Sequence, residues 1–210
     1  MKIIGVLGGI ASGKSRFCEA LGELGARILS ADKIAHAQLE KKDVLEAVVQ
    51  KWGTKILNQE GEIDRKKLAA SVFNDSDRLA ELETILHPLV KEEIDKKIAE
   101  YAAAGIEVVV LDVPLLLEVG WCRIGDEKVP HENDQKIGCD EIVFIETPLE
   151  DRRQRSRVRG WDQYELTRRE AQQAPLEEKK RIATFIADGG GSLRDLNESA
   201  KTLWERVTAK

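Results

Sequence analysis

The segment from residue 8 to residue 15 constrains the fold of this chain more than any other. It reads Gly-Gly-Ile-Ala-Ser-Gly-Lys-Ser and fits the pattern G-x-x-x-x-G-K-[ST]. An apolar run over 2–7 precedes it and predicts a buried strand, while amphipathic spacing over 15–24 predicts a helix. Glycines in this context let the backbone curve round an anion, and the positive end of the helix strengthens the attraction. The sequence therefore predicts a phosphate loop in an α/β fold.

Each part of this loop has an expected role in binding a nucleotide. Lys14 supplies a positive charge for the β- and γ-phosphates, and the Ser15 hydroxyl can ligate Mg²⁺. The residues that we expect to bind the nucleotide are Gly8, Gly9, Ala11, Ser12, Gly13, Lys14, Ser15 and Arg16. Phosphoryl transfer also needs an acidic group near the metal and a group that orients the attacking hydroxyl.

Two aspartates follow predicted strands, where an open α/β sheet places its ligands. Asp112 ends the β-branched run over 107–112, a pattern typical of an aspartate in the Mg²⁺ shell, and we expect it at the metal and the substrate. Asp32 follows the short strand predicted over 27–30 and is the better candidate for accepting the proton of the attacking hydroxyl. The alternative for Asp32 is that it caps the helix that follows.

Composition excludes several classes of protein. The 210 residues carry 33 Lys+Arg against 38 Asp+Glu, and this net charge of −5 argues against a non-specific nucleic-acid binder. The apolar runs are too short to cross a bilayer, and the chain starts as a strand rather than a secretory signal. Three sparse cysteines favour a reduced cytoplasmic protein, and no obligate protein partner is indicated. The sequence lacks Asn-Lys-x-Asp and Leu-Ser-Gly-Gly-Gln motifs, which favours a small-molecule kinase over a GTPase or a transport ATPase.

A polar helix predicted over 149–158 and the residue after it carry a run of arginines. They are Arg152, Arg153, Arg155, Arg157 and Arg159. Arginines on a closing lid can neutralise the charge that develops during phosphoryl transfer, and we expect Arg155 or Arg159, spaced i,i+4, to do so. The alternatives are a solvated helix with Glu150 and Asp151 as partners, and contact with RNA, which the net charge disfavours.

The order of elements predicts a parallel sheet covered by helices. The runs expected to form strands span 2–7, 27–30, 107–112, 141–146 and 182–187. The stretches expected to form helices span 15–24, 33–52 with a break near Lys42, 64–72, 75–86, 87–104, 149–158, 162–173 and 193–207, with Asp64 and Asp75 as candidate N-caps. The helical stretch from 33 to 104 is too long for one crossover and predicts a second lobe. We therefore expect one domain with a core of about 1–32, 105–150 and 180–210, a lobe of about 33–104, and a lid of about 150–179.

The sequence resembles the dephospho-coenzyme A kinase family along nearly its whole length. The motifs that carry the resemblance are the phosphate loop, Ala31-Asp32-Lys33-Ile34-Ala35-His36, Leu86-His87-Pro88, Asp112-Val113-Pro114-Leu115-Leu116-Leu117-Glu118 and Gln173-Ala174-Pro175-Leu176-Glu177-Glu178-Lys179. The resemblance implies a three-layer P-loop kinase fold with a helical lobe and a lid. It also implies ATP-dependent phosphorylation of the ribose 3′-hydroxyl of dephospho-coenzyme A, with ATP and Mg²⁺ bound.

The resemblance also carries roles over to single residues. Lys14 and Ser15 bind phosphate and Mg²⁺, Asp32 faces the attacking hydroxyl, and Arg159 is the first choice for the lid arginine, with Arg155 as a substrate ligand. His87 opens a helix of the acceptor lobe, and two readings stay open for it: contact with the substrate, or packing and capping before Pro88. Another nucleoside or nucleotide kinase, or a nucleotide-binding module without catalysis, remain alternatives for the whole chain.

The chain departs from the family pattern at three places. The phosphate loop has Ala11 where glycine is usual and Arg16 where threonine is usual. The pattern Ala-Asp-x-x-Ile-x-Asn-x-Gly reads Ala-Thr-Phe-Ile-Ala-Asp-Gly-Gly-Gly over 183–191, near the expected adenine site. The polar stretch 121–138 is longer than expected, and we expect a mobile loop at the mouth of the acceptor site. A zinc site of Cys122, His131 and Cys139 is disfavoured because a fourth ligand and close pairs are lacking.

Overall fold

A computed structural model of the chain describes residues 1–72, 75–124 and 137–209. The chain divides into two compact units. The first unit, Met1–Leu29 with Ile98–Lys210, contains the main sheet, and the second, Ser30–Lys97, is helical. In the described residues, no helix is both long enough and apolar enough to cross a membrane.

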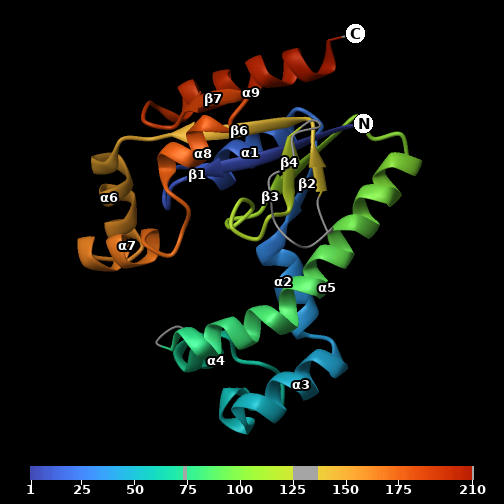
Figure 1. Ribbon diagram of the computed structural model, residues 1–210, viewed down its shortest axis with the longest axis vertical. Helices are drawn as coiled ribbons and strands as arrows, with labels where there is room; N and C mark the ends of the chain where they lie inside the picture. The colour runs from blue at the N-terminus through green and yellow to red at the C-terminus, as the bar shows by residue number, and fades with distance from the viewer. Residues whose placement is uncertain (73–74, 125–136, 210) are drawn as a thin grey trace. The chain divides into compact units, whose positions relative to one another are not determined.

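A five-stranded sheet forms the centre of the first unit, in the order β2-β3-β1-β6-β7 (Figure 1). The strands are β1 (Lys2–Gly8), β2 (Arg27–Ser30), β3 (Val108–Asp112), β6 (Glu141–Glu146) and β7 (Phe185–Asp188). The pairs β1–β3, β1–β6 and β6–β7 are parallel. Runs such as Val-Val-Val-Leu in β3 are buried at every position, because helices and loops cover both faces of a parallel sheet. The predicted α/β fold with a parallel sheet is confirmed.

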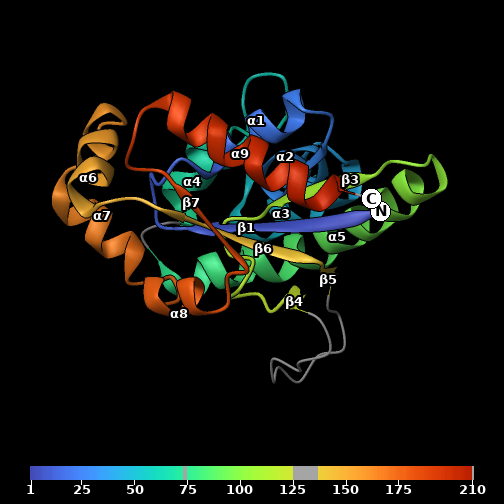
Figure 2. The same ribbon diagram turned by 90° about the horizontal axis from the view of Figure 1, so that it is seen from above.

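Two helices, α1 (Lys14–Glu23) and α9 (Leu193–Thr208), cover one face of this sheet, and α8 (Leu176–Arg181) lies on the opposite side (Figure 2). Phe17, Leu21 and Leu203 are fully buried there against strand residues such as Val6 and Val110. A capping box begins α9, because the Asp195 carboxylate accepts from the Ser192 backbone N–H at 2.7 Å while the Ser192 hydroxyl accepts from the Asp195 N–H. Hydrogen bonds from the Ser192 hydroxyl and, secondly, from the Ser192 backbone N–H hold the pKa of Asp195 below its usual value.

The helical unit has its own apolar core. Its helices are α2 (Ala31–Leu39), α3 (Lys42–Trp52), α4 (Arg65–Val72) and the first part of α5 (Ser76–Ala103), with a short 3₁₀ turn at Thr54–Ile56. Val48, Trp52 and Ile56 are buried together with residues of α4 and α5. The predicted caps are confirmed: one carboxylate oxygen of Asp64 accepts from the backbone N–H groups of Lys66 and Lys67, and Asp75 does the same for α5.

The prediction of separate helices over 75–86 and 87–104 was wrong. A single helix, α5, runs from Ser76 to Ala103 with Pro88 inside it. A proline in a helix interior costs about 3 kcal/mol, but each buried leucine contributes about 1.5–3 kcal/mol. Leu82 is buried in the core, and the partly buried Leu86 and Leu89 pack against it on either side of the proline, so the three leucines together offset its cost. His87 therefore lies inside a helix, so it neither opens nor caps one.

The stretch 121–138 was predicted to be a loop, but its two ends form strands. β4 (Cys122–Ile124) and β5 (Ile137–Cys139) pair in parallel as a separate small sheet. The backbone N–H of Asp140 donates to the carbonyl of Ile3 at 2.8 Å, and its carboxylate accepts from the Ile3 N–H at 2.8 Å, which ties this segment to β1. Residues 125–136, including His131, lie outside the described residues. Within the described residues, no cluster of three or more His, Cys, Asp or Glu could hold a metal ion.

Three short helices, α6 (Leu149–Val158), α7 (Gln163–Glu170) and α8, connect β6 with β7. The Asp162 side chain caps α7 by accepting from the Glu165 N–H at 2.8 Å. The predicted helix over 162–173 ends at Glu170, and Pro175 precedes α8. Glu165 accepts from both Arg168 and Arg169, which lowers its pKa to about 2.

Candidate active site

The phosphate loop leaves the carboxyl end of β1 and enters the first turn of α1. Gly8 and Gly13 have φ values of 156° and 104°, and Ala11 has a φ of 60°. A Cβ atom at Gly8 would lie 2.6 Å from the Ser12 hydroxyl and 3.1 Å from the Ile145 carbonyl, so glycine is required there. Ala11 adopts the left-handed conformation that glycine prefers, which explains why glycine is usual at that position. The expected turn round an anion is therefore present.

Lys14 is the first residue of α1, and its side chain folds back across the loop. The ammonium donates to the carbonyls of Gly8 at 3.0 Å and Gly9 at 3.1 Å. Burial, and secondly repulsion from the Lys179 ammonium, lower the pKa of Lys14 to about 8, while Asp112 opposes that shift. The ammonium is thus held by weak carbonyl acceptors that a charged phosphate oxygen can replace.

We expect nucleotide affinity to fall as pH rises through the pKa of Lys14. The charged ammonium attracts phosphate and the neutral amine does not, so ATP affinity should drop roughly twentyfold between pH 7.5 and 9.5. A lysine in water would keep its charge over this range. Calorimetric titration with ATP measures the effect. Lys14→Arg serves as the control, because a guanidinium remains charged, and a flat profile for the parent protein would contradict the prediction.

Asp112 and Ser15 are the candidate oxygen ligands for Mg²⁺ near Lys14. Asp112 ends β3, which pairs in parallel with β1, so its carboxylate comes to the edge of the sheet that carries the loop. Asp112 raises the pKa of Lys14, which indicates that the two charges interact. Ser15 is exposed in the first turn of α1. Mg²⁺ prefers such hard oxygen donors, with waters and substrate phosphates completing its shell, so these residues fit the metal.

Arg16 is also exposed in the first turn of α1. Its guanidinium forms an ion pair with Glu19 at 3.0 Å. The side chain is therefore engaged on the surface of α1, which leaves the backbone as its contribution to the loop.

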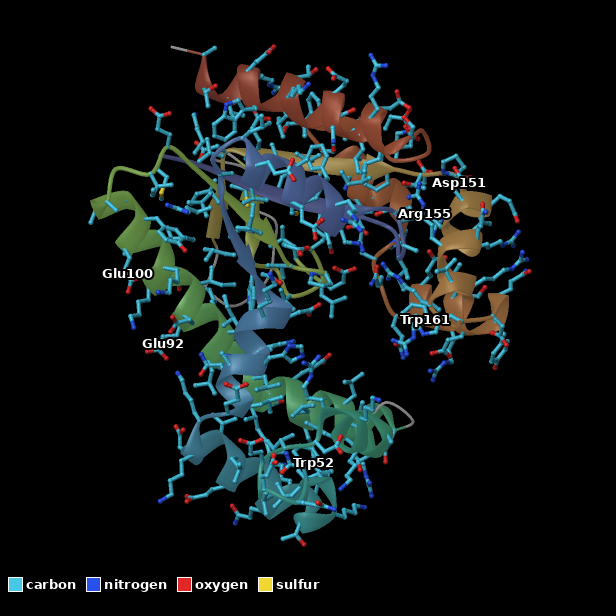
Figure 3. All side chains as sticks on the ribbon, turned by 180° about the vertical axis from the view of Figure 1, so that it is seen from behind. Trp52, Glu92, Glu100, Asp151, Arg155 and Trp161 are labelled. Carbon is cyan, nitrogen blue, oxygen red and sulfur yellow. The ribbon has the colours of Figure 1, made fainter. Side chains whose placement is uncertain are left out.

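Arg155 of α6 forms hydrogen bonds with the phosphate loop. Its guanidinium donates to the carbonyl of Ser12 at 3.1 Å and to that of Gly189 at 2.7 Å. Figure 3 shows it pointing from α6 toward the sheet, while Trp161 lies farther out along the connection to α7. Arg159 is exposed at the C-terminal end of α6. The structure therefore brings the first of these two arginines to the loop.

Arg152 also contacts the phosphate loop, although the sequence marked it only as one member of the arginine run. It is buried, forms an ion pair with Glu170 of α7, and donates to the Thr147 carbonyl at 3.3 Å. Its guanidinium also lies against Gly9. The solvated-helix alternative is wrong for this residue, because its partner is on another helix and not at Glu150 or Asp151.

Gly189 packs directly on the phosphate loop, at the position where the family pattern has asparagine. A Cβ atom there would lie 2.7 Å from the Ser12 carbonyl and 2.6 Å from a methyl of Ile145, and would overlap the Thr147 hydroxyl. That hydroxyl donates to the Ser12 carbonyl at 2.8 Å, and the Gly189 N–H donates to the Glu146 carbonyl at 2.8 Å. The departure from the pattern thus supports the loop through close backbone packing.

We expect Gly189→Ala to destabilise the protein by about 1–3 kcal/mol. The reason is that two of the obstructing groups, the backbone carbonyl of Ser12 and the buried side chain of Ile145, have little room to move aside. Thermal and urea unfolding measure the loss. Gly138→Ala is the matched control, since a Cβ at that strand glycine meets nothing within 4 Å. Equal midpoints for the two variants would contradict the prediction.

Asp32 and His87, the two remaining predicted residues, belong to the helical unit. Asp32 is exposed in the first turn of α2, where the N-cap is Ser30, so the capping alternative for Asp32 is wrong. His36 lies one turn later, and burial followed by repulsion from Arg65 lowers its pKa, which Asp32 opposes. His87 is half-buried within α5.

Comparisons with known proteins agree with the family that the sequence resembles. The family model described as dephospho-CoA kinase matches residues 2–195. The chain is 36% identical to the dephospho-CoA kinase of Carboxydothermus hydrogenoformans over 98% of this chain and 94% of that protein, and 34% identical to that of Aquifex aeolicus over 99% and 98%. Its structure is also similar to those of solved proteins. TT1252 from Thermus thermophilus has a TM-score of 0.74 at 31% identity, covering 99% of this chain and 98% of that one. A dephospho-CoA kinase from Campylobacter jejuni has a TM-score of 0.67 at 25% identity, covering 100% and 98%.

Proposed function

The chain belongs to the dephospho-CoA kinase family, and we propose that it transfers the γ-phosphoryl group of ATP to the ribose 3′-hydroxyl of dephospho-coenzyme A. The products are coenzyme A and ADP. The observation that carries the proposal is the phosphate loop, with Lys14 folded across it, in a chain that matches the family model over residues 2–195. A small molecule is thus the proposed partner, and the cytoplasm the proposed location.

The binding step is an exchange of partners at the loop. The Lys14 ammonium, which donates to the Gly8 and Gly9 carbonyls, turns to the β- and γ-phosphate oxygens of ATP. Those oxygens are charged acceptors, and charge-assisted hydrogen bonds are stronger than bonds to carbonyls. The N–H groups of the loop and of the first turn of α1 bind the same phosphates. Ser15 and Asp112 would hold Mg²⁺, which would supply positive charge to offset part of the negative charge of the phosphates.

Transfer proceeds in line. The ribose hydroxyl oxygen forms a bond to the γ-phosphorus as the bond from that phosphorus to the β-phosphate oxygen breaks, and ADP departs. Asp32 is the proposed acceptor of the hydroxyl proton, because its carboxylate is exposed and is not used to cap α2. Arginines of the proposed lid, Arg155 and Arg159, neutralise negative charge as it develops.

An ADP-release assay with the purified protein tests the proposal. Mg-ATP with dephospho-coenzyme A should give steady turnover, and a panel of nucleosides and nucleotides should give far less. Turnover with another acceptor alone would assign the chain to a different kinase activity. Tight ATP binding by calorimetry without ADP release on any acceptor would show a nucleotide-binding module that has lost catalysis.

A further inference from the structure

Glu118 and Lys179 form a buried ion pair that has no role in the binding and transfer steps proposed above. The Lys179 ammonium lies 2.8 Å from one carboxylate oxygen of Glu118, and the two side chains are 1% and 17% exposed. The same carboxylate oxygen accepts from the backbone N–H of Ala174 at 2.8 Å, and Lys179 also donates to the Gln173 side chain at 3.0 Å. The Glu118 carboxylate thus links the Lys179 ammonium and the Ala174 N–H, and the Lys179 ammonium adds the Gln173 side chain to the same cluster.

Stability is a weak explanation for this pair. Removing two charges from water is costly, and well-packed uncharged side chains often replace a buried pair with no loss of stability. What distinguishes the pair is the geometry that it imposes. Glu118 holds a backbone N–H as well as a side chain, so it fixes the path of the chain and not only the position of one group.

The fixed segment is the one through which the chain returns from α6 and α7 to the sheet. Gln173 and Ala174 lie between α7 and α8, and Lys179 lies on α8. Figure 1 shows α6 and α7 extending from the sheet, and α8 bringing the chain back toward it. Glu118 lies six residues after Asp112, the last residue of β3.

The pair also lies within electrostatic range of the phosphate loop. Of the neighbouring charges, Lys179 has the largest effect on the pKa of Lys14 and lowers it, while Glu118 acts weakly in the opposite direction. Tethering α8 here thus fixes one end of the segment whose other end carries Arg155 on the loop carbonyls.

We propose that Glu118 and Lys179 are positioning residues for phosphoryl transfer, an inference that rests on the proposed function. The pair anchors the C-terminal end of the lid (residues 150–179) to the segment after β3. The connection from the lid back to the sheet is then held in one conformation. The arginines of the lid therefore approach the transferring phosphoryl group in one geometry. Neither residue touches the reacting atoms.

Glu118→Ala tests this role, because it removes the acceptor for both Ala174 and Lys179. We expect kcat, counted per nucleotide-binding site, to fall about a hundredfold, the usual consequence of displaced catalytic groups. ATP affinity measured by calorimetry should change by less than about threefold, since the phosphate loop is intact. Glu118→Gln keeps the acceptor oxygen and should recover kcat to within about tenfold of the parent.

Lys180→Met is the matched control on the same helix. It removes an exposed ion pair with Glu146 and should leave kcat within about twofold of the parent. A folded Glu118→Ala protein with kcat within about threefold of the parent would overturn the inference, as would a parallel loss of kcat and ATP affinity. An inactive parent would instead overturn the proposed function and the inference with it.

A second variant covers the case in which Glu118→Ala does not fold. Glu118→Gln combined with Lys179→Met leaves no charge buried, so the chain should fold. It still removes the ion pair that anchors α8. Reduced kcat at unchanged ATP affinity supports the inference, and kcat equal to that of the parent overturns it.

Discussion

Asp32→Asn should lower kcat about a thousandfold while ATP affinity stays within about threefold of the parent. A positioned general base contributes roughly 10²–10⁴-fold to such a reaction, and the amide cannot accept the proton. The substitution keeps the size of the side chain and leaves the phosphate loop untouched. Steady-state ADP release gives kcat, and calorimetry gives the ATP affinity of the same preparation.

A control must separate this loss from an effect on the helix. Asp32 is the acidic residue in the first turn of α2, where a negative charge stabilises the helix by about 0.3–1 kcal/mol. Asp43 occupies the same position in α3 and is also exposed. Asp43→Asn should therefore reproduce any small loss of stability and leave kcat unchanged. If Asp32→Asn kept kcat within a few-fold of the parent, Asp32 would not be the base.

Lys14→Met should lower kcat/KM for ATP by about a thousandfold or more. The ammonium is the charged group that the loop holds by two carbonyls, and losing one preorganised charged donor at a phosphoryl group typically costs 10²–10³-fold in kcat before any loss of binding. Methionine fills a similar volume, so the fold should survive. Initial rates over a range of ATP concentrations measure the ratio.

The control for Lys14→Met is Lys42→Met. Lys42 is the first residue of α3, as Lys14 is of α1, but it is exposed and lies 3.9 Å from Glu46. Its replacement should leave kcat/KM unchanged, because an exposed pair at that distance contributes little. Retention of kcat/KM within about tenfold by Lys14→Met would mean that another cation holds the phosphates.

Features that depend on neighbouring residues could be predicted from the sequence. The strands over 27–30 and 141–146 and the helix over 149–158 have the predicted bounds, and Asp64 and Asp75 cap the helices that they precede, as predicted. Each rests on a local pattern, such as a run of apolar side chains or a carboxylate one residue before a helix. Pro88 was misjudged because its local cost is outweighed by leucines that pack at a distance.

By itself the sequence determined the phosphate loop and the parallel sheet that carries it, because a glycine-rich turn between a strand and a helix needs only consecutive residues. It also determined the family, through the combination of that loop with the motifs over 31–36, 86–88 and 112–118. The tertiary structure alone decided which side chains support that loop. Arg152 forms an ion pair with Glu170. The Ala174 N–H donates to the carboxylate of Glu118, which is 56 residues away, and the Thr147 hydroxyl donates to the carbonyl of Ser12, which is 135 residues away. Buried polar groups must find partners wherever the packed chain provides them, and no spacing along the sequence records which partner that is.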